Sequence, residues 1–229
     1  MKFVVTAGPT REFIDPVRFL SNPSTGKMGF AVARAARAAG HDVVLIAGPV
    51  SLKTPPGVRR VDVVSARDML KAVRAELGMP RSRAATGQIA LVMTAAVADW
   101  RPARCATCKF KKSEMDGTLH LVRNPDILKT VRGPRVRIGF AAETGAPAAE
   151  AARKCREKGL DLVVGNDVTE PGSGFGTDTN HVTFVTPDGN VQRLPLMGKL
   201  AVARRIVSFA ERIADVGVAF KPDRKGNGK

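Results

Sequence analysis

Tyrosine is absent from the 229 residues, and aromatic residues make up only 5% of them. Few side chains are therefore available to stack against single-stranded nucleic acid. No apolar run approaches the roughly 20 residues that a membrane-spanning helix needs. The first residues, Met1 and Lys2, lead directly into apolar strand residues, which is not the pattern of a secretory signal peptide. These absences argue against a specific nucleic-acid-binding or membrane protein, and they predict a soluble protein of the cytoplasm.

Only three cysteines are present, Cys105, Cys108 and Cys155, so the chain has no even-numbered disulfide framework of the secretory type. This agrees with a reducing compartment. Cys105 and Cys108 have the spacing of half a zinc site, but a second pair is missing and the histidines are scattered. No Ser-His-Asp order and no suitable pair of carboxylates supports hydrolysis. Structural zinc and hydrolytic chemistry are therefore not expected.

Basic residues, in contrast, are plentiful. Lys and Arg number 37 against 21 Asp and Glu, which gives a formal net charge of +16. A strongly cationic protein attracts anions, whether nucleotides, phosphorylated metabolites or nucleic acid, and charge alone does not choose among them. The basic residues are dispersed over several predicted helices, which does not favour a nucleic-acid interface.

Apolar segments with the pattern of buried strands alternate with segments of helical periodicity. Strands are predicted at 2–6, 42–47, 60–64, 89–95, 136–141 and 161–165, and helices near 26–39, 66–77, 126–132 and 147–158. This alternation predicts an α/β protein whose mostly parallel sheet carries helices on both faces. Ligands of such sheets bind beyond the carboxyl ends of the strands, so we expect the loops after the first, fourth and fifth strands to converge there.

The alternation of strand and helix patterns ends after Val164. Residues 181–196 have the pattern of a hairpin about the turn Pro187–Asn190, and a helix is predicted from Lys199 to Ile213. We interpret residues 166–196 as an appended β-arm.

The length is that of one large domain with a sizeable core. We assign residues 1–215 to this domain. Residues 80–88 are predicted to form a surface loop, and the Gly- and Lys-rich residues 216–229 a disordered basic tail.

The segment from Val5 to Gly29 runs from a strand through a polar loop into a helix. Unpaired N–H groups and the helix dipole favour phosphate or carboxylate at such a helix start. The polar residues gathered there are Arg18, Ser21, Asn22, Ser24, Thr25 and Lys27. The segment therefore predicts an anion site, although an ordinary loop with a helix cap has the same outline.

Two familiar phosphate motifs do not fit this segment. A Walker A loop fails because Ser21 stands where that motif has glycine and Met28 where it has Ser or Thr. A dinucleotide fingerprint fails because Gly8 is followed by Pro9 and the second strand ends at Gly48 without an acid.

Polar residues at the exits of later strands are further candidates. Asp99 is the only carboxylate in a run of small residues, so it is a candidate ligand of Mg²⁺ or of a ribose hydroxyl, or else it caps a turn. Lys109–Lys112 alone has the composition of a solvated turn, and Asn124–Asp126 that of a helix start. Lys154 and Lys158 are four residues apart and share one helix face.

Seven motifs, in this order, resemble those of the phosphopantothenate–cysteine ligase family of coenzyme A biosynthesis, also called phosphopantothenoylcysteine synthetase. They are GPTREFIDPVRFLSNPSTGKMG, AAVADWRP, KFKK, NPDI, GFAAET, KGLDLVVGNDV and the stretch Gly174–Asn180. One tetrapeptide alone is weakly specific, but together they cover the chain from Val4 to about Ile213. The resemblance implies a Rossmann-like fold with a β-appendage used in dimerisation, which agrees with the predicted sheet and C-terminal hairpin arm.

The resemblance also implies a two-step reaction. Members activate the carboxylate of 4′-phosphopantothenate on a nucleoside triphosphate and release pyrophosphate, and the amine of cysteine then displaces the nucleoside monophosphate. Fixed cations and amide groups neutralise the charge that develops in each step. Lys109–Lys112 is similar to the Lys-x-Lys-Lys form of the bacterial members, so CTP is the implied co-substrate, with Mg²⁺ as cofactor.

The family's functional residues are carried over by position. Asn22 matches the asparagine that stabilises the acyl-cytidylate, Arg18 lies beside it in sequence, and Lys109 matches the mobile-loop lysine of the activation step, so these three are the catalytic candidates. The implied nucleotide-binding residues are Met93, Thr94, Ala95, Asp99, Lys109, Val122, Arg123, Asn124, Pro125, Phe140, Lys154 and Lys158, with Asp99 also the candidate Mg²⁺ ligand. The implied phosphate- and substrate-binding residues are Gly8, Ser24, Gly26, Lys27 and Ala96.

The implied partners are 4′-phosphopantothenate, cysteine and a second copy of the chain in a homodimer. Many bacterial members are fused behind a flavin-dependent phosphopantothenoylcysteine decarboxylase. Here Met1 begins at the first ligase strand, so we expect either a free-standing ligase with a separate decarboxylase as partner, or a fragment of a longer chain.

Some features leave alternatives open. Thr25 replaces a more usual Ser, and a disulfide between Cys105 and Cys108 would stiffen the chain before Lys109, unless both are ordinary loop cysteines. Outside the family, the alternatives are a nicotinamide-dependent oxidoreductase on a similar sheet, which the failed glycine fingerprint disfavours, and a basic nucleic-acid-binding module, which is supported only by the charge.

Overall fold

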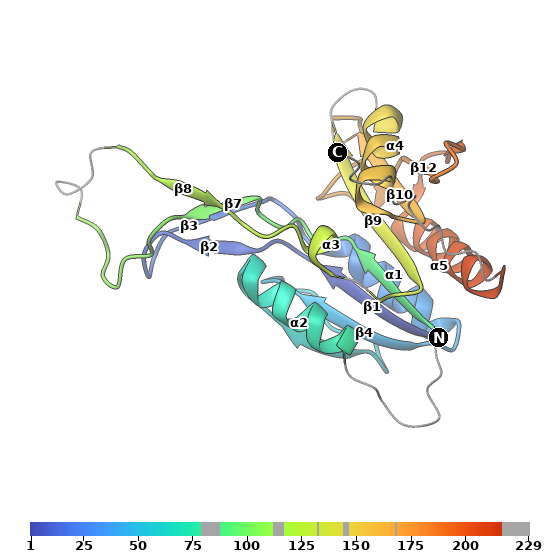
Figure 1. The fold of residues 1–229 in the computed structure, drawn as a ribbon, viewed down its shortest axis with the longest axis horizontal. Coiled ribbons are helices and arrows are strands. Elements are labelled where there is room, and N and C mark those ends of the chain that lie inside the picture. Colours follow the sequence, from blue (N-terminus) through green and yellow to red (C-terminus); the bar gives the residue numbers. More distant parts are fainter. Residues whose placement is uncertain (79–87, 112–116, 132, 144–146, 168, 217–229) are drawn as a thin grey trace, which may run out of the picture.

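In the computed structural model, which describes residues 1–78, 88–111, 117–131, 133–143, 147–167 and 169–216, the chain is built around a sheet covered by helices (Figure 1). Its elements are β1 Lys2–Ala7, β2 Arg11–Phe13, β3 Phe19–Ser21, α1 Lys27–Ala38, β4 Asp42–Ala47, β5 Arg59–Asp62, α2 Ala66–Gly78, β6 Ile89–Met93, β7 Trp100–Pro102, β8 Leu121–Arg123, α3 Ile127–Thr130, β9 Val136–Glu143, α4 Pro147–Lys158, β10 Leu162–Asp167, β11 Thr179–Asn180, β12 Val182–Val185, β13 Val191–Arg193, β14 Met197–Gly198 and α5 Lys199–Val216.

The main sheet has eight strands in the order β13-β12-β10-β9-β6-β1-β4-β5. The pairings from β10 through β5 are all parallel, whereas β12 and β13 are antiparallel to their neighbours. The carboxyl ends of six parallel strands therefore lie along one edge of the sheet, where the ligand crevice of such a fold is found.

Each face of the sheet has its own hydrophobic core. Successive side chains of a strand point to opposite faces, so Phe3 and Val5 pack with α1 and α5 on one face, and Val4 packs with α2 and α4 on the other. Strands buried on both faces are apolar along their whole length, which is the reason for the continuous apolar runs in the sequence. The α/β fold with helices on both faces is therefore confirmed.

The six predicted strands and five predicted helices are all present, with ends that differ by a few residues. The largest difference is the helix predicted at 126–132, which is limited to Ile127–Thr130 because Val131 already has an extended backbone with ψ 146°. The hairpin predicted about Pro187–Asn190 is present as β12 and β13. Because β12 pairs with β10, this hairpin extends the main sheet. The prediction that residues 166–196 form a separate β-arm is wrong in this respect.

The projecting part of the molecule comes from other residues. The β2–β3 hairpin and the β7–β8 ribbon, with their loops, extend together beyond the edge of the sheet (Figure 1). We call this unit the arm; it comprises residues 11–21, 100–111 and 117–123. Its two halves are joined by hydrogen bonds such as that from Ala106 N to Ile14 O, at 2.9 Å. Its three-residue strands are too short to give a periodic sequence signal.

Two predictions lie largely outside the described residues, namely the surface loop at 80–88 and the basic tail at 216–229. Over the described ranges, none of the helices combines the length and apolar character needed to cross a bilayer.

Candidate functional site

A cavity of about 800 Å³ lies at the carboxyl ends of the parallel strands. Its volume is in the range of pockets that hold nucleotide-sized ligands. Most of the side chains predicted to form the site line it, together with others. The predicted residues in its wall are Asn22, Ser24, Gly26, Lys27, Met93, Thr94, Ala95, Ala96, Asp99, Arg123, Asn124, Pro125, Phe140, Lys154 and Lys158.

The start of α1 forms one wall of the cavity. Gly26 caps α1 in a left-handed conformation, with φ 79°, and no side chain caps the helix. Gly29 lies in the first turn, where an added Cβ would be 2.5 Å from both Ala7 Cβ and Thr94 Oγ1. Only glycine permits this close approach of helix and strands. The N–H groups of the first turn and the positive end of the helix dipole therefore favour an anion at this wall.

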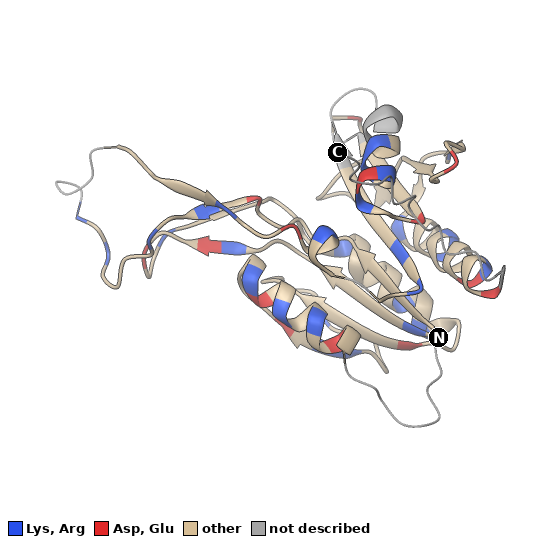
Figure 2. Cartoon of the chain, viewed as in Figure 1, with Lys and Arg blue, Asp and Glu red and all other residues tan. Residues whose placement is uncertain are grey.

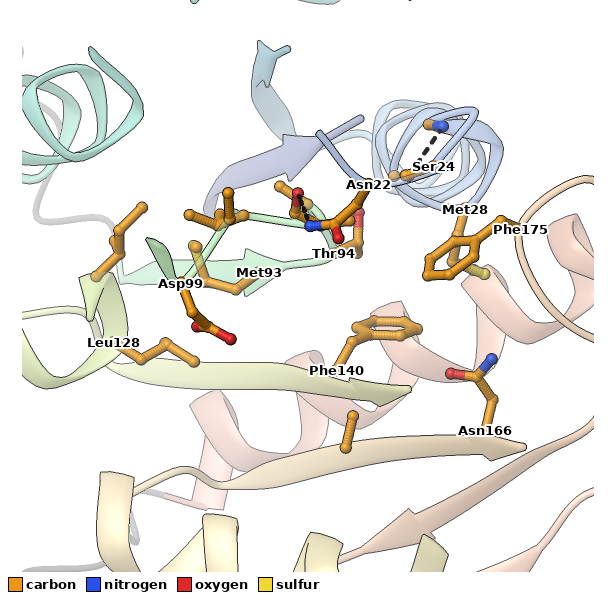
Figure 3. A pocket seen from close by; sticks show the side chains of 18 of the residues that line it. Asn22, Ser24, Met28, Met93, Thr94, Asp99, Leu128, Phe140, Asn166 and Phe175 are labelled. Atoms are coloured by element: carbon orange, nitrogen blue, oxygen red, sulfur yellow. Dashed lines mark hydrogen bonds between the residues drawn. The ribbon is translucent and has the colours of Figure 1, made fainter. Parts of the chain in front are cut away.

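The segment 94–99 forms the floor and is held by hydrogen bonds to the buried Thr6 and Thr10. Thr94 Oγ1 donates to Thr6 O at 2.6 Å, and Ala98 N donates to Thr10 Oγ1 at 3.0 Å. Asn22 Nδ2 donates to Ala96 O at 3.1 Å, which fixes the orientation of the Asn22 amide at the cavity (Figure 3). The small side chains of this segment leave room in the cavity for a ligand.

Gly8 lies behind the floor rather than in the wall. Its carbonyl oxygen accepts a hydrogen bond from Ala96 N at 2.9 Å, and the left-handed φ of 76° at Gly8 is one that favours glycine. Gly8 therefore supports Ala96, which was predicted, like Gly8 itself, to bind phosphate or substrate.

The segment 122–125 is joined to the floor at the opposite end of the cavity. Asn124 N donates to Asp99 O at 2.8 Å, and Asn124 Nδ2 donates to Ala98 O at 2.9 Å. The carboxylate of Asp99 is exposed and lies on the cavity side of its segment (Figure 3). Asn124 and Asp99 are therefore brought together by contacts that the sequence motifs did not specify.

Asp126 supplies a second carboxylate in this wall. It caps α3 by accepting a hydrogen bond from Lys129 N at 3.1 Å, as predicted for a helix start, and it pairs with Lys158 Nζ at 2.9 Å. Burial opposes its ionisation, but hydrogen bonds from Lys158 and Lys129 outweigh burial, so the pKa of Asp126 lies below its ordinary value. Asp126 is thus held as an anion that orients Lys158.

Basic side chains outnumber acidic ones around the cavity. The basic residues in its wall are Lys27, Arg123, Lys129, Lys154, Lys158 and Lys199, against the acids Asp99 and Asp126. Elsewhere, basic residues are spread over α2, α4, α5 and the arm (Figure 2). The cavity therefore suits a ligand with several negative charges.

Sequence reasoning missed the wall formed by the segment 174–180 and by Lys199. Phe175 and Lys199 line the cavity, and Lys199 is only 6% exposed. Burial, and then the nearby Lys27 ammonium, lower the pKa of Lys199 below its ordinary value. The Gly174–Asn180 motif was a signal for this wall, but Lys199 at the start of a helix gave none.

Besides Gly8, three predicted site residues do not line the cavity: Arg18, Lys109 and Val122. Arg18 lies at the turn of the β2–β3 hairpin, where its guanidinium binds Asp15 Oδ2 through Nε at 2.9 Å. This contact is the main reason why the pKa of Asp15 is held well below its ordinary value. The neighbour of Lys109, Phe110, binds the same turn through Phe110 N and Asp15 Oδ2, at 3.3 Å. Arg18 and Lys109 are therefore placed together on the arm, away from Asn22.

The carboxylates, thiols and histidines are the side chains that could hold a metal ion. Among the described residues, no group of three or more His, Cys, Asp or Glu side chains is placed to hold an ion. Cys105 and Cys108 are exposed free thiols of the arm. Mg²⁺ is commonly held by one or two carboxylates together with substrate phosphates, and Asp99 fits that limited role.

Comparisons with known proteins agree with this geometry. A family model described as DNA/pantothenate metabolism flavoprotein C-terminal domain matches residues 1–213. Coenzyme A biosynthesis bifunctional protein CoaBC of Bacillus subtilis (strain 168) is 46% identical over 208 residues, which make up 89% of this chain and 49% of that protein. The protein of the same name from Escherichia coli (strain K12) is 42% identical over 224 residues, or 93% of this chain and 53% of that protein.

Among solved structures, the crystal structure of the C-terminal domain of coenzyme A biosynthesis bifunctional protein CoaBC is 38% identical. The match covers 94% of this chain and 96% of that chain, with a TM-score of 0.76. This chain spans about half the length of the curated relatives that it matches.

Proposed function

This chain belongs to the DNA/pantothenate metabolism flavoprotein C-terminal domain family, as the sequence motifs predicted, and we propose that it acts as a phosphopantothenate–cysteine ligase. The observation that carries the proposal is the convergence of the motif segments from Asn22, Asp99, Asn124, Phe140 and Lys158 on one cationic cavity. These segments are far apart in sequence, and the proposed reaction needs their groups in one place.

In the proposed reaction a carboxylate oxygen of 4′-phosphopantothenate attacks the α-phosphorus of CTP. A new phosphorus–oxygen bond forms, and pyrophosphate leaves with the electrons of the bond that breaks. The amine of cysteine then attacks the acyl carbon, CMP leaves, and the nitrogen loses a proton to give the amide. Both transition states develop negative charge on oxygen, which fixed cations and amide donors stabilise.

We assign the nucleotide to the end of the cavity bounded by Asp99, Asn124 and Lys158. Lys154 and Lys158, both on α4, supply positive charge for a triphosphate at that end, and Asp126 orients the Lys158 ammonium. The small side chains before Asp99 leave room for a flat base. Mg²⁺, when bound with the triphosphate, would neutralise phosphate charge beside Asp99.

We assign the phosphorylated acyl substrate to the end formed by α1. Its phosphate binds the N–H groups at the uncapped start of α1, beside Gly26 and Lys27, and its carboxylate reaches the amide of Asn22. This orientation leaves the carboxylate between the two ends, where it meets the α-phosphorus.

The first test is a reconstitution with purified protein. Pyrophosphate release that requires both CTP and 4′-phosphopantothenate, followed by amide formation on addition of cysteine, supports the ligase. NADPH oxidation without CTP dependence would favour the oxidoreductase, and salt-sensitive DNA retention without either reaction would favour the nucleic-acid-binding module. Replacing CTP by ATP in the same assay determines the nucleotide preference.

We also propose that the protein works as a homodimer through the arm. Seven of the ten exposed large apolar side chains among the described residues belong to the arm: Val17, Phe19, Trp100, Phe110, Leu119, Leu121 and Val122. An exposed group of apolar residues on short strands is a typical interaction surface. This location replaces the segment 166–196 as our candidate for the dimer contact.

A dimer also gives a role to Lys109. Because Lys109 is held on the arm, away from the cavity of its own chain, we propose that it serves the cavity of the partner.

Asn22→Asp places a negative charge beside the acyl-cytidylate, so this variant should form the intermediate and turn it over poorly. Lys109→Gln removes the cation of the activation step, so this variant should form no intermediate.

Co-expression of these two inactive variants with different tags tests the shared site. A dimer that contains both variants has one cavity with Asn22 and Lys109 intact, so random pairing should restore about a quarter of the wild-type activity. If Lys109 acts within its own chain, every cavity carries one substitution and the mixture stays inactive. Sedimentation of the wild type at low micromolar concentration should show two chains, and an active monomer would contradict the proposal.

A further proposal rests on the relatives. These relatives are named bifunctional proteins, so we propose that a flavin-dependent phosphopantothenoylcysteine decarboxylase, on the same or a separate chain, receives the product. The cytoplasmic location stays a prediction from the sequence.

A further inference from the structure

Lys199 is a buried lysine whose ammonium is fully occupied by the protein. Its Nζ donates to Gly174 O at 2.8 Å, to Thr177 O at 2.7 Å and, over a longer distance of 3.4 Å, to Phe175 O. A lysine ammonium has three donors and no acceptor. All three are directed to carbonyl oxygens of one segment, so the function of Lys199 is to hold that segment rather than to bind a ligand.

The same segment is also fastened to the start of α1. Thr25 Oγ1 donates to Phe175 O at 2.7 Å, and Lys27 Nζ donates to Gly176 O at 3.0 Å and pairs with Asp178 Oδ1 at 2.7 Å. The segment 174–178 therefore bridges the first residues of two helices, α1 and α5. We call this segment the bridge.

The bridge borders only one end of the cavity. In Figure 3, Phe175 lies beside Met28 of α1 on one side of the Phe140 ring, whereas Asp99 and Leu128 lie on the other side. A change in the position of the bridge therefore alters the α1 end directly, and the Asp99 end only through other parts of the wall.

We propose that Lys199 is a positioning residue that fixes the bridge against the start of α1 and so sets the affinity for the phosphorylated acyl substrate, but not for the nucleotide. This inference rests on the proposed function, because it assigns that substrate to the α1 end. Without the ammonium, three carbonyl oxygens lose a charged donor and the bridge relaxes. Thr25 and Lys27 then lose fixed partners at the anion site.

Lys199→Met tests the inference because methionine keeps the length and apolar stem of lysine without its donors. Lys199→Arg keeps a cation and several donors. Arg205→Met is the matched control, since it removes an exposed cation from the same helix. Calorimetric titration with 4′-phosphopantothenate and with CTP, each alone, measures the two affinities without any need for turnover.

We expect Lys199→Met to weaken 4′-phosphopantothenate binding about tenfold or more, because small displacements of a binding wall have effects of this order. CTP binding should stay within about twofold of the wild type. Lys199→Arg should recover most of the lost affinity, and Arg205→Met should bind both ligands normally. In steady-state kinetics the KM for 4′-phosphopantothenate should rise while the KM for CTP does not.

A purely structural role predicts a different result. Partial unfolding lowers the active fraction and the apparent kcat, and it leaves both affinities of the folded molecules unchanged. Unchanged binding of 4′-phosphopantothenate by Lys199→Met, or equal loss for both ligands, would overturn the inference. If the wild type binds neither ligand, the proposed function fails instead, so the two failures are distinguishable.

Discussion

Gly29 lies where the first turn of α1 touches the exits of β1 and β6, and Gly29→Ala is the most informative single substitution for the geometry of the site. The added Cβ would lie 2.5 Å from Ala7 Cβ, 2.5 Å from Thr94 Oγ1 and 2.9 Å from Thr6 O. Carbon atoms in contact are normally about 3.5–4.0 Å apart. The backbone oxygen of Thr6 and the Cβ of Ala7 belong to a buried strand, so α1 has to move away.

The expected loss of stability follows from two opposing terms. Overpacking of a buried site costs up to about 3 kcal/mol, and the greater helix propensity of alanine returns about 1 kcal/mol. The net change is a loss of about 2 kcal/mol in the free energy of unfolding. For a chain of this size about 1 kcal/mol corresponds to about 2–4 °C, so Tm should fall by about 4–8 °C.

Thermal unfolding monitored by circular dichroism measures this change, and Gly78→Ala is the matched control. Gly78 is also helical, but an added Cβ there meets nothing within 4 Å, so the control should be as stable as the wild type or slightly more stable. Displacement of α1 should also raise the KM for 4′-phosphopantothenate in Gly29→Ala alone. A Gly29→Ala protein with unchanged Tm would refute the close packing of α1 on the strands.

Two further predictions concern titratable groups away from the cavity. Burial opposes the ionisation of Glu76, but hydrogen bonds from Arg59 and Lys2 outweigh it, so the pKa of Glu76 lies below its ordinary value of 4.5. The stability from this carboxylate is therefore present above about pH 4.5 and is lost as the pH falls through the lowered pKa. Glu76→Gln should cost about 1–3 kcal/mol at pH 7 and less at about pH 3, and denaturant titrations that show the same loss at both values would contradict this assignment. Burial raises the pKa of Cys155 to about 12, so iodoacetamide at about pH 8 should modify the two exposed cysteines of the arm and spare Cys155 until the protein is unfolded, as mass spectrometry can establish.

The sheet and its helices were predictable because they follow from local patterns. Phe3–Val5 and Val43–Ile46 are buried on both faces, so each strand appears in the sequence as an unbroken apolar run. The arm was not predictable in this way. Strands such as Phe19–Ser21 and Leu121–Arg123 are short, partly exposed and stabilised by their pairing, which no single segment reveals.

The composition of the cavity was also predictable in part. Phe140 belongs to β9 and Asp99 lies in the segment that follows β6, and parallel strands present their carboxyl ends at one edge of the sheet. Lys199 was not predictable, because its ammonium reaches a segment more than twenty residues earlier in the chain. The exact partners of its three N–H groups depend on the antiparallel pairing of β11 with β14.

The amino-acid sequence by itself thus determined the fold class and the family, through its periodicity and the order of its motifs, and it named about half of the residues in the cavity wall. Only the tertiary structure decided where Arg18 and Lys109 lie. Arg18 precedes Asn22 by four residues, but extended backbone between them spans about 13 Å, and the hairpin directs it outward to Asp15 and the arm. Arg18 and Asn22 are therefore close in sequence but apart in the structure, because the pairing of β2 with β3 sets the direction of the hairpin.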